Sequence, residues 1–161
     1  MAQEKLNFEG FLEAAADPKD RAFAQDLHGY LLENGCKAAF EEKKTGLLGS
    51  YKHTKTKRAI INLLLKKKGL LVRIYGENAN KYLDFLHTLP AEMVESIDSA
   101  SICKRLVHNT CSPKCSGYDV TIGGTRFQKC RYSCFEFLRT EESASYIRSF
   151  VENELGERTA V

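Results

Sequence analysis

The feature that most constrains the fold of this chain is a series of short apolar runs between residues 37 and 75, separated by turn residues. The runs have strand-like lengths, are rich in apolar and β-branched residues, and are divided by turns at Gly46 and Gly69. Residues 60–65 are almost continuously apolar, as expected for a central strand buried on both faces. We therefore predict three or four antiparallel strands in a meander.

A helix is predicted before this meander. Asp17 can act as the N-cap, Pro18 suits the first helical position, and apolar residues then recur at helical spacing as far as Gly35. The preceding residues 6–16 form either a short helix or an arm, because Gly10 lowers their helical propensity.

Three more helices are predicted after the meander. The first begins at the cap residue Asn78 and is stopped by Pro90. A short one follows, with its apolar positions within residues 93–97. The last covers roughly residues 142–155 and is expected to end before Gly156.

A second β-hairpin is predicted near the C-terminal end, with the Gly-Gly pair at 123–124 as its two-residue loop. In that register Ile122 faces Thr125, and counting outward brings Gly117 opposite Cys130. The hairpin thus brings cysteines toward its open end.

These patterns predict an α+β fold in which an antiparallel β-meander is covered by amphipathic helices, with a cysteine-bearing hairpin and a terminal helix appended. The 161 residues fit one domain, 1–161, with a helix-meander-helices core over 1–100 and the hairpin and last helix over 101–161. A hydrophobic content of 43% is that of a globular protein.

Four cysteines predict a metal site. They read C-x3-C, fourteen intervening residues, C-x3-C, and four thiolates can form the tetrahedral shell of a structural zinc ion. His108 and Cys103 are alternative ligands. Unliganded thiols, disulfides, redox chemistry and an iron-sulfur cluster remain open as other interpretations. The predicted ligands are Cys111, Cys115, Cys130 and Cys134.

The net charge of +3 conceals a segmental pattern, since residues 37–73 carry eleven Lys or Arg against only two acidic residues. If these charges share one face of the sheet, they form a surface for nucleic acid or another anionic partner, where Tyr51 and Tyr75 could stack on bases. Lysines in turns and at strand edges also serve solubility, which is the alternative. The predicted anion-binding residues are Lys52, Lys55, Lys57, Arg58, Lys66, Lys67 and Lys68.

Catalytic patterns are sparse, and the sequence favours a non-enzymatic binding module stabilised by metal. The alternative is an enzyme or small-molecule binder with a pocket between sheet and helices that uses His53, His108 or a reactive cysteine. His28 and His87 fall in predicted helices, where partly buried, hydrogen-bonded histidines are expected. No catalytic residue is assigned.

No apolar run approaches the eighteen residues of a membrane span, and the N-terminal residues do not form a secretory signal, so we expect a cytoplasmic protein without a membrane partner. In a reducing cytosol cysteines are more often thiols or metal ligands than disulfides. Cys36 and Cys103 are expected to be buried as small apolar side chains. The oligomeric state is not predicted.

Two segments carry resemblances. The elements C-x-P-K-C at 111–115 and Q-K-C-R-Y at 128–132 resemble the C-terminal segment of an uncharacterised family of bacterial cytosolic proteins, which implies an intracellular bacterial protein and no particular activity. The first 90 residues, with the stretch GLLVRIYGENANKYLDFLHTLP, resemble small bacterial α+β domains grouped with frataxin-like iron chaperones. An iron-chaperone role needs exposed carboxylates, whereas this meander is basic.

Overall fold

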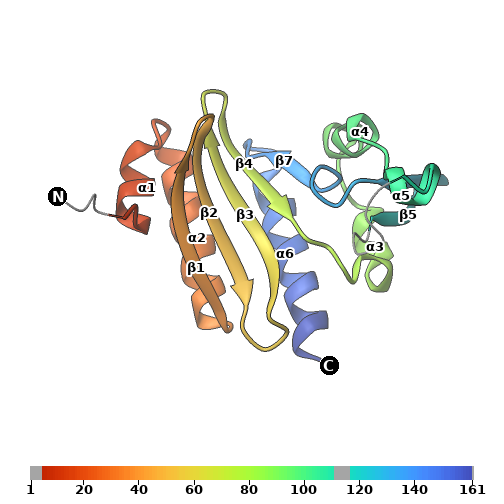
Figure 1. Cartoon of the computed structure of the whole chain (residues 1–161), viewed down its shortest axis with the longest axis horizontal. Helices are drawn as coiled ribbons and strands as arrows, with labels where there is room; N and C mark the ends of the chain where they lie inside the picture. Colours follow the sequence, from red (N-terminus) through yellow and green to blue (C-terminus); the bar gives the residue numbers. More distant parts are fainter. Residues whose placement is uncertain (1–4, 111–116, 161) are drawn as a thin grey trace.

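The computed structural model describes residues 5–110 and 117–160, and it has the predicted α+β architecture (Figure 1). One antiparallel sheet of five strands has the order β1-β2-β3-β4-β7, and β5 pairs with β6 in a second sheet. The strands are β1 (Cys36–Lys43), β2 (Gly46–His53), β3 (Arg58–Lys66), β4 (Gly69–Ile74), β5 (Tyr118–Ile122), β6 (Thr125–Lys129) and β7 (Glu136–Leu138). The helices are α1 (Phe8–Ala14), α2 (Pro18–Glu33), the 3-10 helix η1 (Ala79–Lys81), α3 (Leu83–Leu86), α4 (Ala91–Ser99), α5 (Lys104–Val107) and α6 (Ala144–Thr159).

The predicted meander is confirmed as the four consecutive strands β1 to β4. Residues 60–63 of β3 are buried in succession, as expected for a central strand. The β1–β2 turn requires glycine at position 46, because φ there is 151° and a Cβ would overlap the carbonyl oxygen of Leu65. The fifth strand, β7, was not predicted from the sequence.

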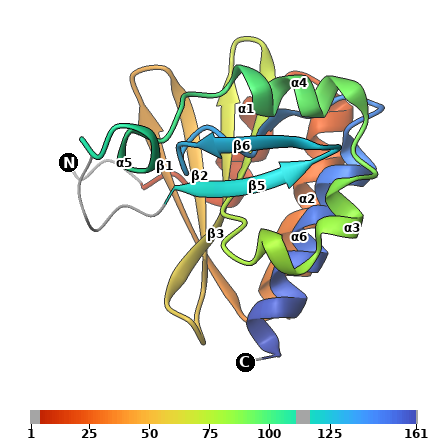
Figure 2. The same ribbon diagram turned by 90° about the vertical axis from the view of Figure 1, so that its right-hand side faces the viewer.

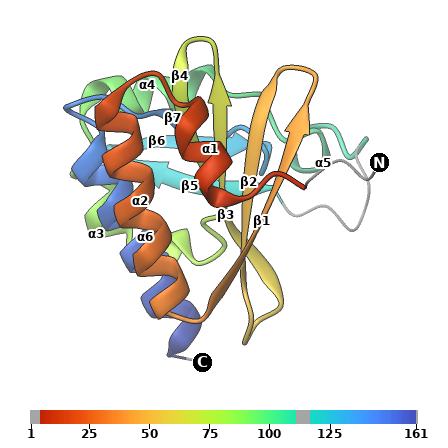
Figure 3. The same ribbon diagram turned by 90° about the vertical axis from the view of Figure 1, so that its left-hand side faces the viewer.

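Helices α1, α2 and α6 cover one face of the long sheet (Figure 3). The ion pair between Arg148 of α6 and Asp26 of α2 joins two of these helices, and Arg148 also lies over the ring of Tyr30 at 4.1 Å. Leu27 and Phe150 contribute fully buried side chains to the core beneath this layer. The covering helices therefore follow the predicted arrangement.

The ends of the helices agree only partly with the predictions. The Asp17 carboxylate accepts a hydrogen bond from the Lys19 amide at 2.8 Å, and Gly35 follows α2 with φ of 82°, so both predicted limits of α2 are confirmed. The helix predicted from Asn78 is instead two short pieces, η1 and α3, and the Asn78 side chain donates to Glu154 rather than capping η1. Helix α6 was predicted to end before Gly156, but it continues through Gly156 to Thr159.

In the small sheet β5 lies beside β6 (Figure 2), and the register is the predicted one, with Ile122 opposite Thr125 and Tyr118 opposite Lys129. Its Tyr118 ring packs on Phe135 at 4.8 Å between centroids, and Phe135 packs on Phe150 of α6 at 4.9 Å. These rings connect the hairpin to the main core. In the described parts of the chain, no helix is long and apolar enough to cross a membrane.

Candidate functional site

Two hairpin turns bring lysines together at one end of the long sheet (Figure 1). The β1–β2 turn and the β3–β4 turn lie at the same end because β2 and β3 are neighbours, and both line one open hollow of about 560 Å³. A second hollow, of about 400 Å³, lies between the β3–β4 turn and the start of α2. We call the lysines of these two turns the turn-lysine cluster: Lys43, Lys44, Lys66, Lys67 and Lys68.

The charge of the turn-lysine cluster is largely unneutralised. Lys43 pairs with Glu41 at 3.0 Å, but the other four lysines form no ion pair with any residue that the structure describes. The nearby carboxylates Asp17 and Asp20 both bind the Arg139 guanidinium. Glu42 also lines the larger hollow, so the two hollows carry an excess of positive charge rather than ammonium groups alone.

The predicted basic residues do not form one surface. Strand β3 separates Arg58 from Lys66 by about 26 Å at the usual rise per residue, so the seven residues divide between opposite ends of the sheet. At the far end Arg58 pairs with Glu77 at 3.2 Å, and Lys55 donates to the Thr159 carbonyl at 3.4 Å. Lys66, Lys67 and Lys68 lie together, and Lys43 and Lys44 lie near them. The sequence analysis did not predict these two neighbours. The signal was available, because alternate turns of an antiparallel meander lie at the same end of the sheet.

The two tyrosines predicted to stack on bases are buried. Tyr51 is 1% exposed and shares a hydrogen bond of 2.7 Å with His28 Nδ1. Tyr75 is 4% exposed, and its hydroxyl accepts a hydrogen bond from Asn62 at 2.9 Å. Both rings serve the packing of the sheet, so this prediction was wrong. Tyr132, which is 53% exposed, was not predicted to stack on bases.

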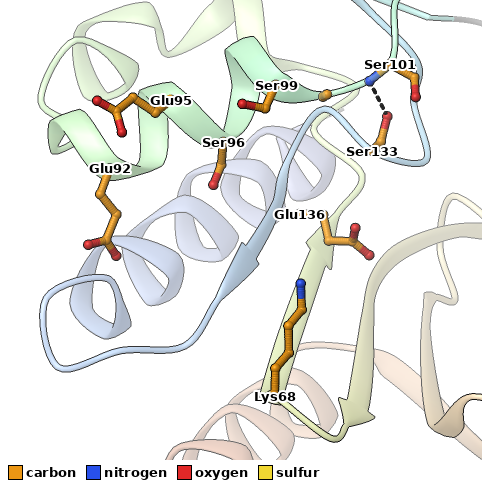
Figure 4. Close-up of a pocket in the computed structure, with 9 residues that line it drawn as sticks. Lys68, Glu92, Glu95, Ser96, Ser99, Ser101, Ser133 and Glu136 are labelled. Atoms are coloured by element: carbon orange, nitrogen blue, oxygen red, sulfur yellow. Dashed lines mark hydrogen bonds between the residues drawn. The ribbon is translucent and has the colours of Figure 1, made fainter.

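A polar groove of about 530 Å³ lies between α4 and the strand β7 (Figure 4). Its carboxylates are partly committed, since Glu136 pairs with Arg73 at 3.0 Å and Glu92 accepts from the Thr140 hydroxyl at 3.3 Å. Among the described residues that line it there is no histidine or cysteine, and no hydrogen bond joins the hydroxyl of a lining serine to Lys68 or to a lining carboxylate. The lining residues are Lys68, Glu92, Glu95, Ser96, Ser99, Ala100, Ser101, Ser133 and Glu136.

The cysteine cluster is described only in part, because Cys111 and Cys115 lie outside the described residues. Cys130 and Cys134 follow β6 one turn apart, and the Cys134 amide donates to the Cys130 carbonyl at 2.9 Å. Within 5–110 and 117–160, no group of three or more His, Cys, Asp or Glu side chains is arranged to hold a metal ion. The four-cysteine zinc site therefore remains a prediction.

The alternative ligand Cys103 lies beside this cluster. Its amide donates to the Gln128 carbonyl at 2.9 Å, next to the bridge between Ile102 and Lys129, and its sulfur occupies the space that a Cβ of residue 117 would need. Cys103 is buried, as predicted. Burial also raises the pKa of the Cys134 thiol well above its ordinary value, so that sulfur is protonated near neutral pH unless a metal binds it.

The histidines of the alternative, catalytic interpretation do not meet. His53 at the end of β2 is 2% exposed, with Nδ1 3.0 Å from the Thr56 hydroxyl, and burial lowers its pKa, assisted by the nearby charges of Arg158 and Lys55. His108 is exposed and directly follows α5, a helix that lies away from the end of β2 (Figure 1).

The two helical histidines differ from each other. The His28 ring stacks on Phe8 at 3.6 Å between centroids and is partly buried, as predicted. His87 is exposed at the end of α3, so the expectation of burial was wrong for that residue.

Comparison with known proteins gives no relative for this chain. No protein-family model, no curated protein and no solved structure matches it.

Proposed function

We propose that this protein is a non-enzymatic binding module that contacts nucleic acid through the turn-lysine cluster. The observation that carries the proposal is the convergence of two lysine-rich turns on one hollow, where Lys44, Lys66 and Lys67 have no carboxylate partner among the described residues. Lysine is a point charge on a flexible stem, which suits contact with phosphate groups without reading of the base sequence. Binding of this kind is strongly weakened by salt.

We also propose that a structural zinc ion stabilises the cysteine-bearing end of the molecule, with Cys111, Cys115, Cys130 and Cys134 as its ligands. The adjacency of Cys130 and Cys134 supports this, and Cys103, whose amide bonds to Gln128 of β6, is a described substitute. A closed shell of four sulfur ligands stabilises a fold and leaves no position for a substrate. The proposed nucleic-acid contact and the proposed zinc ion therefore belong to different parts of the molecule, the turn-lysine cluster and the cysteine-bearing end.

The binding proposal is tested by fluorescence anisotropy with labelled single-stranded DNA and RNA between about 50 and 200 mM salt. The test variant is Lys44→Gln/Lys67→Gln, and the matched control is Lys52→Gln/Lys55→Gln, which removes the same charge from the other end of the sheet. Loss of two phosphate contacts should reduce the slope of log affinity against log salt by about 1.4 in the test variant. The control should retain most of the slope.

Two results would contradict the binding proposal. Equal losses in both variants would indicate that net charge alone attracts the nucleic acid, without a defined surface. No measurable binding at the lowest salt concentration would end the proposal outright.

The zinc proposal is tested by elemental analysis of the purified chain, together with a count of reactive thiols before and after denaturation in chelator. We expect about one zinc per chain, and Cys130→Ser should lose the metal and destabilise the C-terminal region. Absence of metal combined with wild-type stability of Cys130→Ser would show that the cysteines are ordinary core residues.

A further inference from the structure

Strand β1 is a long unpaired edge of the main sheet. In the described part of the chain it pairs only with β2, over eight residues, whereas the opposite edge strand β7 has three. Lys43 and Gly46 flank a two-residue turn, so the backbone groups of odd-numbered residues of β1 form hydrogen bonds with β2. The hydrogen bond of 3.0 Å from the Thr54 amide to the Gly35 carbonyl follows the same alternation. The backbone groups of Ala38, Phe40 and Glu42 therefore point away from the sheet.

The charges on this edge are incompletely paired within the chain. Lys37 lies directly opposite Lys52 of β2, both are exposed, and neither forms an ion pair with a described residue. Like charges directly opposite each other are unfavourable. Glu41 lies four positions after Lys37, on the same face of β1. Its ion-pair partner Lys43 belongs to the same strand. An opposite charge facing Lys37 from outside would relieve the repulsion.

We propose that β1 pairs antiparallel with β1 of a second copy of this chain, with the two-fold axis at Ala39, to form one continuous sheet. In this register Lys37 faces Glu41 of the partner subunit, and the symmetry repeats that pair. Ala39, which is exposed and small, faces its own counterpart at the axis, where a close approach is needed. Ala38 and Phe40 carry the new backbone hydrogen bonds on either side.

The symmetry leaves few other registers. A two-fold axis exchanges the two strands, so a single residue must lie at the axis and face itself. An axis at Phe40 would set Lys37 against Lys43 of the partner subunit, which repeats the repulsion. An axis at Ala38 would set Glu41 against Gly35 of the partner subunit, without any charge pair. Charges usually protect an edge strand from pairing, and here their spacing permits the self-complementary pairing with the axis at Ala39.

Charge reversal tests the register. Sedimentation equilibrium of the full chain should show a reversible dimer, and Lys37→Glu or Glu41→Lys alone should weaken dimerisation by about tenfold or more, because each creates two like-charge contacts. The double variant Lys37→Glu/Glu41→Lys should restore it, because both pairs are re-formed with their signs exchanged. Lys37→Glu should not unfold the protomer, since the new carboxylate faces Lys52.

Ala38→Pro tests the backbone pairing independently. Proline removes an amide that points out of the sheet, so the β1–β2 ladder should survive while the dimer is lost. Circular dichroism and thermal melting should confirm that each variant is folded. A monomeric wild-type chain at all concentrations would overturn the proposal, as would a dimer that is unaffected by Ala38→Pro or by the single charge reversals.

Discussion

Glu154 is a carboxylate with no exposed surface, so hydrogen bonds and a positive charge within the protein must replace its hydration. It accepts hydrogen bonds from the Tyr82 hydroxyl at 2.6 Å, from the Asn78 amide and side chain at 2.9 Å each, and from Arg158 Nε at 2.8 Å. Arg158 in turn donates to the carbonyls of Tyr75 and Arg58. One charge pair on α6 thus satisfies groups from two distant segments of the chain.

Arg158→Ala should therefore be strongly destabilising. It leaves the buried carboxylate of Glu154 without its counter-charge, and breaking a buried pair in this way costs about 3–5 kcal/mol of unfolding free energy. The control is Arg126→Ala, which removes an exposed pair with Asp119 and should change stability little. Urea unfolding measures the free energy of unfolding of both variants. If Arg158→Ala loses as little stability as Arg126→Ala, the buried network is not stabilising.

His53 should make stability depend on pH. Burial lowers the pKa of His53 in the folded protein, so between that value and the ordinary value of about 6.5 the unfolded chain binds more protons. Stability contributed by the neutral imidazole is complete above pH 6.5 and is lost as the pH falls through this window. His53→Gln should flatten the decrease of the urea midpoint between about pH 7.5 and 5.5. An unchanged pH dependence would contradict this account.

At the scale of elements, glycines show why some ends were predicted and others were not. Gly35 and Gly46 have positive φ and mark the end of α2 and the β1–β2 turn, as their sequence context indicated. Gly156 also follows an amphipathic helical segment, but α6 continues through it because tertiary contacts hold the buried side chains of Leu155 and Arg158. Glycine predicts an end only where the backbone needs positive φ.

Alanine substitutions should separate these glycines. A Cβ at Gly156 meets no atom within 4 Å, so Gly156→Ala should stabilise the protein by about 0.5–1 kcal/mol through helical propensity. A Cβ at Gly49 of β2 would lie 2.7 Å from the Phe40 ring, so Gly49→Ala should destabilise it by about 1–3 kcal/mol. Thermal unfolding gives the sign of each effect, and a stabilising Gly49→Ala would contradict the packing described.

At the scale of the whole molecule, the sequence predicted what depends on local pattern. Apolar runs and turn residues predicted the meander, and the Gly-Gly loop predicted the register of β5 and β6. Strand β7 has three residues and pairs with β4 from far along the chain, so no local pattern could indicate it. The lysine surface was misplaced for a related reason, because charge clustering depends on which strand ends meet in space.

Helix α6 joins these distant parts, and its removal should unfold the chain. Ile147, Phe150, Val151 and Leu155 are almost fully buried, and burying them contributes together roughly 6–12 kcal/mol. That is comparable to the entire stability of a typical domain, about 5–15 kcal/mol. A chain that ends at Glu142 should lack dispersed amide signals in NMR spectra, whereas a control that ends at Arg158 should remain folded. Cooperative unfolding of the shorter chain would show instead that the β-meander and its remaining helices form a stable core without α6.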